Sequence, residues 1–192
     1  VGAGCGKSSP ALLDSFGTHL DTLMTSKDKL SKMDGAAADL CVIENEDEFS
    51  ENDIEAPAGA LFNITDQKTL YSKNANDERE IASITKIMTA LLAMKYADLS
   101  QEVTISYTPE GLESSAVLCG FEQGDKMMLS SLLSAALIYS GNDAAIDIAI
   151  AVAGSQEAFV DMMNQESKEL MTSHTHFANP TGLTQSKHYS SV

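Results

Sequence analysis

A serine and a lysine three residues apart, Ser83 and Lys86, are the residues in this sequence best suited to chemistry. On a helix such side chains are neighbours, with Cβ atoms about 5–6 Å apart. The surrounding stretch, REIASITKIMTALLAM from Arg79 to Met94, is apolar on almost every side of a helix, and such helices are normally buried. Burial lowers the pKa of an amine, so a neutral Lys86 can take the Ser83 hydroxyl proton. The pair predicts an activated nucleophile that needs no histidine.

The Ser-x-x-Lys spacing alone does not identify a catalyst, because the sequence contains it twice. The second copy, Ser26–Lys29, lies in a polar stretch with no apolar helix behind it. Lys86 could also snorkel, with its stem on apolar surface and its amine in water. The nearly complete apolar ring and the small residues Ala90 and Ala93 on the same face favour a buried amine. A helix beginning at Ser83 would also place its positive end where it favours developing negative charge.

A second polar group, Ser140-Gly141-Asn142, interrupts an otherwise continuous apolar helical stretch. Two hydrogen-bonding side chains and a flexible glycine between buried helices would present a polar tip to whatever the core surrounds. The alternative is an ordinary interhelical turn in which Asn142 or Asp143 caps the second helix. The residues themselves leave both interpretations open.

The elements that position these groups are predicted from the spacing of the apolar residues. Residues 1–56 form an acidic, polar leader or tether. Residues 59–77 predict two antiparallel strands with a turn at Asp66–Lys68. A helix from Ser83 to about Ala97 follows, then a short extended piece, VTISY, and a glycine-punctuated loop region over residues 111–127.

The remainder predicts helices. Two apolar helices are broken at 140–142, and the second stops at Gly154. Ser155 is expected to cap a third helix, whose apolar stripe consists of Phe159, Met162, Met163 and Leu170. A turn at Pro180–Gly182 ends the pattern. Strands followed by helices indicate an α+β fold, a helical subdomain plus part of an antiparallel sheet, and we expect the missing strands beyond Val192.

Composition excludes several classes of function. The 192 residues are 43% hydrophobic, which is enough for one globular domain with a substantial core. The formal charge of −16, with Arg79 as the only arginine, argues against nucleic acid or an anionic membrane as partner. The sequence has no uninterrupted apolar run near the roughly 18 residues of a membrane span.

The cysteines and histidines give little support for a metal site. Cys5, Cys41 and Cys119 are far apart and form no Cys-x-x-Cys pair. A Cys41–Cys119 disulfide would suit an exported protein, with two separate buried thiols as the alternative. His174 and His176 could share one side of a strand, but no third ligand is nearby, so we expect no metal.

The first residues, VGAGC, resemble the end of a bacterial lipoprotein export signal, in which the cysteine becomes the lipidated first residue. Cys5 would then tether the protein to a membrane. Gly2 stands where that signal usually has leucine, and a linker of small residues is the alternative interpretation.

SITK followed some fifty residues later by YSGNDAA resembles the penicillin-binding, serine-type D-alanyl-D-alanine carboxypeptidases. These low-molecular-mass penicillin-binding proteins have the β-lactamase/DD-peptidase fold. The similarity runs from about Ala60 to Val192 and includes the segments LYSKNAND, KIMTALLAMKY, AFVDMMNQESKEL and THFANPTGL. It implies that residues 57–192 are the N-terminal and helical part of an incomplete peptidase domain.

The resemblance also implies roles for particular residues. Ser83 would form the acyl-enzyme, with its backbone N–H as half of the oxyanion hole, and Lys86 would be the general base. Ser140 would relay a proton to the departing amine, and Asn142 would donate a hydrogen bond to the substrate carbonyl. The family removes the terminal D-alanine from peptidoglycan stem pentapeptides outside the bacterial cytoplasm, without a cofactor, and β-lactams inhibit it by acylating the same serine.

Two departures from the family pattern stand out. Ile81 occupies a position where relatives usually have proline. More seriously, no Lys-Thr-Gly occurs in the 192 residues, so we do not expect this stretch alone to turn over substrate. A β-lactamase of the same fold is the first alternative, although Gly141 replaces the usual aspartate and no Glu-x-x-Leu-Asn segment is present. A catalytically silent wall-binding relative is the second, and only the missing third motif supports it.

Overall fold

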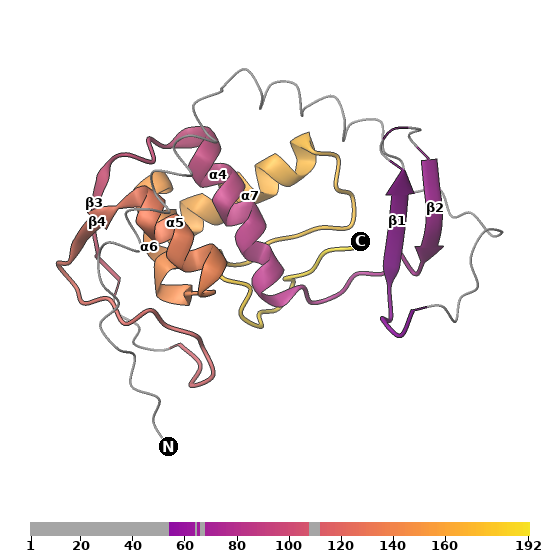
Figure 1. Ribbon diagram of the computed structural model, residues 1–192, viewed down its shortest axis with the longest axis horizontal. Helices are drawn as coiled ribbons and strands as arrows, with labels where there is room; N and C mark the ends of the chain where they lie inside the picture. The colour runs from indigo at the N-terminus through magenta and orange to yellow at the C-terminus, as the bar shows by residue number, and fades with distance from the viewer. Residues whose placement is uncertain (1–53, 64, 66–67, 108–111) are drawn as a thin grey trace.

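The computed structural model describes residues 54–63, 65, 68–107 and 112–192 (Figure 1). Most of the predicted leader lies outside the described residues, as do the second Ser-x-x-Lys, Ser26–Lys29, and the cysteines Cys5 and Cys41. The lipid tether and the Cys41–Cys119 pairing therefore stay predictions.

The first two strands form the predicted hairpin. β1 (Gly59–Asn63) pairs antiparallel with β2 (Lys68–Lys73), with an irregularity between Leu61 and Phe62. Alternate residues of β2, Thr69 and Tyr71, are buried, as the two-residue period of a strand requires. The hairpin stands at one end of the molecule, apart from the helices (Figure 1).

The predicted nucleophile segment is helical but begins differently from the expectation. Ala82–Thr85 forms a 3₁₀ turn, η1, and the α-helix α4 spans Lys86–Tyr96. The prediction that the α-helix starts at Ser83 is therefore wrong. Ala82 has a positive φ of 45°, and no side chain caps the turn, so the chain enters the helix through the tighter 3₁₀ geometry.

The apolar ring of α4 is buried on one side only. Ala90, Leu92 and Ala93 lie in the core, as predicted for the small residues beside Lys86. Ile84 and Ile87, in contrast, are 64% and 65% exposed, so the expectation of an almost completely buried helix is wrong. The periodicity of an all-apolar helix cannot say which of its faces the neighbouring elements leave uncovered.

Three further helices follow largely as predicted. α5 (Leu129–Ile138) and α6 (Asn142–Ala153) are separated at the expected break, and Gly154 stops α6 with a φ of 83°. The side chain of Ser155 accepts a hydrogen bond from the N–H of Ala158 and caps α7 (Gln156–Glu169). α7 ends at Glu169, one residue before Leu170, and Leu170 is 45% exposed. The prediction that Leu170 belongs to the buried stripe is therefore wrong.

One strand was missed. β3 (Glu102–Thr104) falls near the predicted extended piece, and it pairs antiparallel with β4 (Lys126–Met128). The sequence predicts a loop for this second segment. Three residues are too few to show a period, and only the pairing with β3 defines them as a strand. Among the described residues each of the two sheets has two strands, so the fold is α+β.

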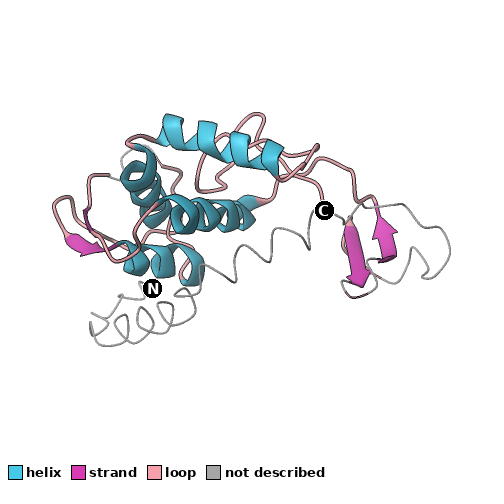
Figure 2. Cartoon of the chain, turned by 90° about the horizontal axis from the view of Figure 1, so that it is seen from above, coloured by secondary structure: helices cyan, strands magenta, loops and turns pink. Residues whose placement is uncertain are grey.

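The core lies between the helices. α6 is buried along most of its length, and its alanines Ala144, Ala145 and Ala149 allow α4, α5 and α7 to approach closely. Apolar residues of α4, α5 and α6 form one cluster, and residues of α4, α6 and α7 form the other. Figure 2 shows the helices gathered together with the strand pairs at opposite ends. No helix in the described part of the chain is both long and apolar enough to cross a bilayer.

A buried carboxylate joins α4 to α7. The side chain of Glu166 is 5% exposed, and its two oxygens accept hydrogen bonds from Nζ of Lys95 at 2.8 and 3.0 Å. The hydroxyl of Tyr96 donates a weaker bond to the same carboxylate at 3.5 Å. The hydrogen bond to Glu166 raises the pKa of Lys95, so this lysine is charged at neutral pH. It fixes the C-terminal end of the helix that carries Lys86.

We predict that Lys95→Met lowers the free energy of unfolding by about 1–3 kcal/mol, because the Glu166 carboxylate then lacks its cation. Urea denaturation at neutral pH measures this change. Lys126→Met is the matched control, because its pair with Glu102 is exposed on both sides, and it should change stability by less than about 1 kcal/mol. Equal losses for the two variants would contradict the prediction.

Candidate active site

The amine of Lys86 lies at the centre of a cluster of hydrogen bonds. Lys86 is only 2% exposed, and its Nζ contacts Ser83 Oγ at 3.1 Å and Ser140 Oγ at 3.4 Å. Asn142 Oδ1 and the backbone carbonyl of Thr181 each accept a hydrogen bond from it at 2.9 Å. The structure therefore brings all four predicted site residues together around one buried amine.

The two serines lie at the open side of this cluster. Ser83 is exposed, and Ser140 Oγ donates a hydrogen bond to Ser83 Oγ at 2.9 Å. In a 3₁₀ turn residues i and i+3 eclipse, so η1 places Ser83 directly over Lys86. Ala82 and Ser140 have φ values of 45° and 62°, an uncommon conformation for residues other than glycine. Such strain, about 1–3 kcal/mol per residue, is typical of functional sites.

Burial lowers the pKa of Lys86 from 10.5 to about 8. Its position adds to this effect, because Lys86 is the first residue of α4, where the positive end of the helix dipole disfavours a cation. With a pKa near 8, about one Lys86 in ten is neutral at pH 7, against fewer than about one in a thousand for an ordinary lysine. The buried amine can therefore serve as a base near neutral pH.

Asn142 bridges Lys86 and the preceding loop. Its Oδ1 faces Lys86, while its Nδ2 and its backbone N–H both donate to the carbonyl of Val117, at 3.1 and 2.9 Å. The side-chain amide has two hydrogens, so one remains for a ligand. The interpretation of Asn142 or Asp143 as a helix cap is wrong, because Gly141 occupies the N-cap position and no side chain caps α6.

The carboxylate of Asp143 instead holds the loop that passes over Gly141. It accepts hydrogen bonds from the backbone N–H groups of Cys119 and Gly120 at 2.9 and 3.0 Å. This brings the Cys119 sulfur so close to Gly141 that a Cβ on that residue would collide with it. A side chain in the middle of the Ser-Gly-Asn group would therefore force the Cys119 side chain to move.

The turn after α7 contributes groups that the sequence did not assign to the site. Lys86 donates to the carbonyl of Thr181, and the hydroxyl of Thr89 donates to the carbonyl of Pro180 at 2.7 Å. In the sequence FANPTGL predicts a turn and carries part of the family resemblance, but no contact with Lys86. A backbone carbonyl has no sequence signature, so residue types could not reveal this contact.

A buried histidine, His188, was also missed. Its Nδ1 accepts the N–H of Ala178 at 3.0 Å, so we assign the ring proton to Nε2, which lies 2.7 Å from Thr85 Oγ1. Burial lowers the pKa of His188, which favours the neutral ring. Of the two histidines predicted to share one side of a strand, His176 contacts the carbonyl of Lys187, and His174 lies 3.9 Å from a Glu78 oxygen. The described residues hold no cluster of three potential metal ligands among His, Cys, Asp and Glu.

Comparison with known proteins identifies the family. The model of the D-alanyl-D-alanine carboxypeptidase family matches residues 45–192. D-alanyl-D-alanine carboxypeptidase DacF of Bacillus subtilis is 40% identical over 143 residues, covering 72% of this chain and 36% of DacF. The chain belongs to this family, the low-molecular-mass penicillin-binding proteins.

Solved structures agree on the fold. Penicillin-binding protein 6B from Escherichia coli matches with a TM-score of 0.66 and 28% identity, over 78% of this chain and 51% of that chain. Penicillin-binding protein D2 from Listeria monocytogenes, in its cefotaxime-bound form, matches with a TM-score of 0.62 and 25% identity. The match covers 77% of this chain and 60% of that chain. The predicted DD-peptidase fold is confirmed. The chain spans about a third of the length of the curated relatives it matches.

We predict that Gly141→Ala lowers the free energy of unfolding by about 1–3 kcal/mol, because the new methyl group overlaps the Cys119 sulfur. Removing that sulfur should relieve the overlap, so Cys119→Ala combined with Gly141→Ala should recover most of the loss. A double-mutant cycle by thermal or urea unfolding measures the coupling. Losses that simply add would show that the two residues do not compete for space.

Proposed function

We propose that this chain carries the acylation machinery of a serine-type D-alanyl-D-alanine carboxypeptidase. The observation that carries the proposal is the buried Lys86 amine, with its pKa lowered to about 8, at 3.1 Å from Ser83 Oγ. Family membership and the 40% identity to DacF support this reaction over other uses of an activated serine.

In the proposed reaction neutral Lys86 takes the proton of Ser83 as its oxygen attacks the carbonyl between the two terminal D-alanines. The bond to the leaving D-alanine breaks, its nitrogen receives the proton, and an ester to Ser83 remains. Ser140 Oγ lies 2.9 Å from Ser83 Oγ and 3.4 Å from Lys86 Nζ, so it can pass that proton outward. Water then hydrolyses the ester. Asn142 would hold the substrate carbonyl with its second amide hydrogen.

The proposed substrate is the peptidoglycan stem pentapeptide, and β-lactams are the proposed inhibitors because they acylate the same serine. The relative from Listeria monocytogenes was solved with cefotaxime bound, which supports this inhibitor class. Because peptidoglycan lies outside the cytoplasm, we place the protein on the cell-wall side of the bacterial membrane. The reaction uses a lysine base and needs no cofactor.

The geometry favours a carboxypeptidase over a β-lactamase of the same fold. β-Lactamases usually carry aspartate in the middle of the second motif, and Gly141 has no space for a side chain beside Cys119. A catalytically silent relative is also disfavoured. It would have no need to bury an amine against two serines or to hold Ala82 and Ser140 in strained conformations.

The first test is covalent labelling with a fluorescent penicillin. The full-length protein should be labelled, Ser83→Ala should abolish labelling, and Ser26→Ala in the second Ser-x-x-Lys should leave it unchanged. Gel fluorescence and mass spectrometry of the labelled peptide measure the outcome. Labelling that survives Ser83→Ala would refute the assignment of the nucleophile.

The second test uses pH. The folded-state pKa of Lys86 lies below its ordinary value, and only the neutral amine accepts a proton, so acylation should rise with pH and level off above about 8. Between pH 6 and pH 7 the rate should increase about tenfold. Lys86→Arg, which is always charged, should abolish acylation. Stopped-flow penicillin acylation measures the profile, and a flat profile from pH 6 to pH 10 would contradict it.

A further inference from the structure

We propose that residues 179–182, Asn179-Pro180-Thr181-Gly182, form a positioning loop that directs the lone pair of neutral Lys86 at the Ser83 hydroxyl. We call this segment the NPTG loop. The inference rests on the proposed function, because it concerns the base of the acylation step. It assigns a role to a turn whose carbonyls accept hydrogen bonds from Lys86 and Thr89.

The hydrogens of a neutral amine explain why orientation matters. Such an amine has two N–H donors and one lone pair, arranged as a tetrahedron. Asn142 Oδ1 and the Thr181 carbonyl oxygen can only accept hydrogen bonds, and each lies 2.9 Å from Lys86 Nζ. They therefore take both amine hydrogens, and the lone pair is left for the hydroxyl of Ser83 at 3.1 Å. Without the Thr181 carbonyl, an amine hydrogen could face Ser83 instead.

The loop is held rigid from within by Asn179. Its Oδ1 accepts three hydrogen bonds, from the N–H of Thr181 at 3.1 Å, the hydroxyl of Thr181 at 2.9 Å and the N–H of Gly182 at 2.7 Å. Its Nδ2 donates to the carbonyl of Leu183 at 2.9 Å and to Gln185 Oε1 at 3.0 Å. One side chain thus closes the turn that aims the Thr181 carbonyl at Lys86.

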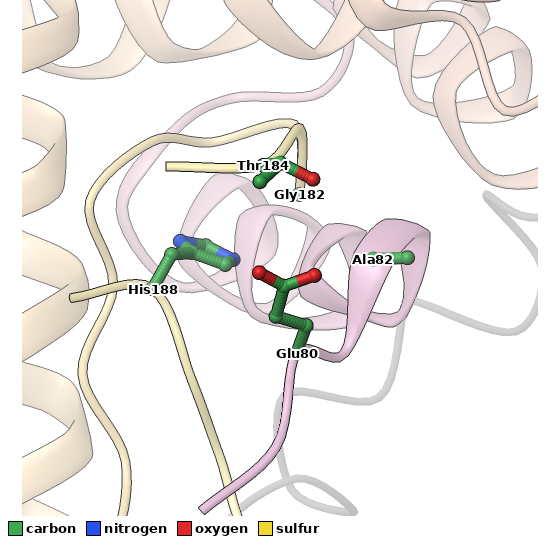
Figure 3. A pocket seen from close by; sticks show the side chains of 5 residues that line it. All are labelled: Glu80, Ala82, Gly182, Thr184 and His188. Carbon is green, nitrogen blue, oxygen red and sulfur yellow. The ribbon is translucent and has the colours of Figure 1, made fainter. Parts of the chain in front are cut away.

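The loop is also attached to the nucleophile segment on both sides of Ser83. Gly182 has a φ of 85° and packs so closely on the Ala82 carbonyl that a Cβ would overlap it. Thr89, one turn after Lys86, donates to the Pro180 carbonyl at 2.7 Å. Figure 3 shows a small pocket with Gly182 and Thr184 on one side. Ala82, which lies in η1, and Glu80, just before η1, line the pocket as well, and His188 completes it. The loop therefore fixes the amine relative to Ser83.

The experiment compares Asn179→Ala with a matched control, Asn164→Ala. Asn164 also holds backbone of this segment, bonding the carbonyl and N–H of Phe177 at 2.8 and 2.9 Å, but it does not touch the NPTG loop. In the full-length protein, the penicillin acylation rate constant per folded molecule should fall at least about tenfold in Asn179→Ala and less than about twofold in Asn164→Ala. The dissociation constant of the initial complex should stay unchanged in both.

Two more variants separate orientation from folding. Asn179→Asp keeps the oxygen that accepts three hydrogen bonds, so it should recover most of the rate. Thr89→Val keeps the shape of a buried side chain but frees the Pro180 carbonyl, and should slow acylation about threefold even if Asn179→Ala does not fold. The defects should persist at pH 10, where Lys86 is neutral and only its orientation can limit the rate.

Acylation at the wild-type rate in folded Asn179→Ala or Thr89→Val, while Ser83→Ala is inactive, would overturn the positioning role and leave the proposed function intact. A defect that disappears at pH 10 would also overturn it, because protonation and not orientation would then be the cause. Wild-type protein that is not acylated at all would overturn the proposed function, and the positioning role with it.

Discussion

The desolvation of one amine is the interaction on which the rest of this structure depends. Lys86 lies 2% exposed among polar groups that hydrogen-bond to it but carry no charge of their own. An ammonium ion in such a place loses hydration that neutral acceptors do not fully replace, so its pKa falls to about 8. The same acceptors keep the amine in one place. Burial therefore provides basicity, and hydrogen bonding provides position.

The surrounding fold can be understood as the support for that amine. α6 contributes Asn142 to the site, and two carboxylates on the same helix hold nearby segments. Asp143 fixes the loop at Cys119 and Gly120, and Asp147 accepts hydrogen bonds from the backbone N–H groups of Ser106 and Tyr107. Asp147 is only 1% exposed, and its burial raises the pKa of its carboxyl. The Lys86 side of the site is therefore buried, while Ser83 stays exposed at its open side.

Sequence reasoning predicted a group of four residues from their side chains, and the structure places those side chains together. The spacing of Ser83 and Lys86 in an apolar helix is the physical clue to that pair, whereas the roles of Ser140 and Asn142 follow from the family resemblance. The spacing of apolar residues and the residue types at turns also predicted the hairpin, the break before α6 and the cap at Ser155. These features are local, so a window of residues contains the information that defines them.

What the sequence could not show was decided by contacts between distant segments. At Ala82, where the 3₁₀ turn starts, the backbone carbonyl packs closely against Gly182, a hundred residues later. The strand at Lys126–Met128 exists through its partner β3, and the exposure of Ile87 depends on which faces of α4 other elements cover. The Thr181 carbonyl belongs to the backbone and leaves no trace in residue type.

The most direct measurement of the central claim is the pKa of Lys86 itself. Protein labelled with ¹³C at the lysine Cε can be titrated by NMR, with the Lys86→Arg variant assigning the resonance. The account predicts a midpoint near 8 for Lys86, well below the ordinary lysine value of 10.5. A midpoint for Lys86 at that ordinary value would mean that the amine is hydrated and charged, and would contradict the account.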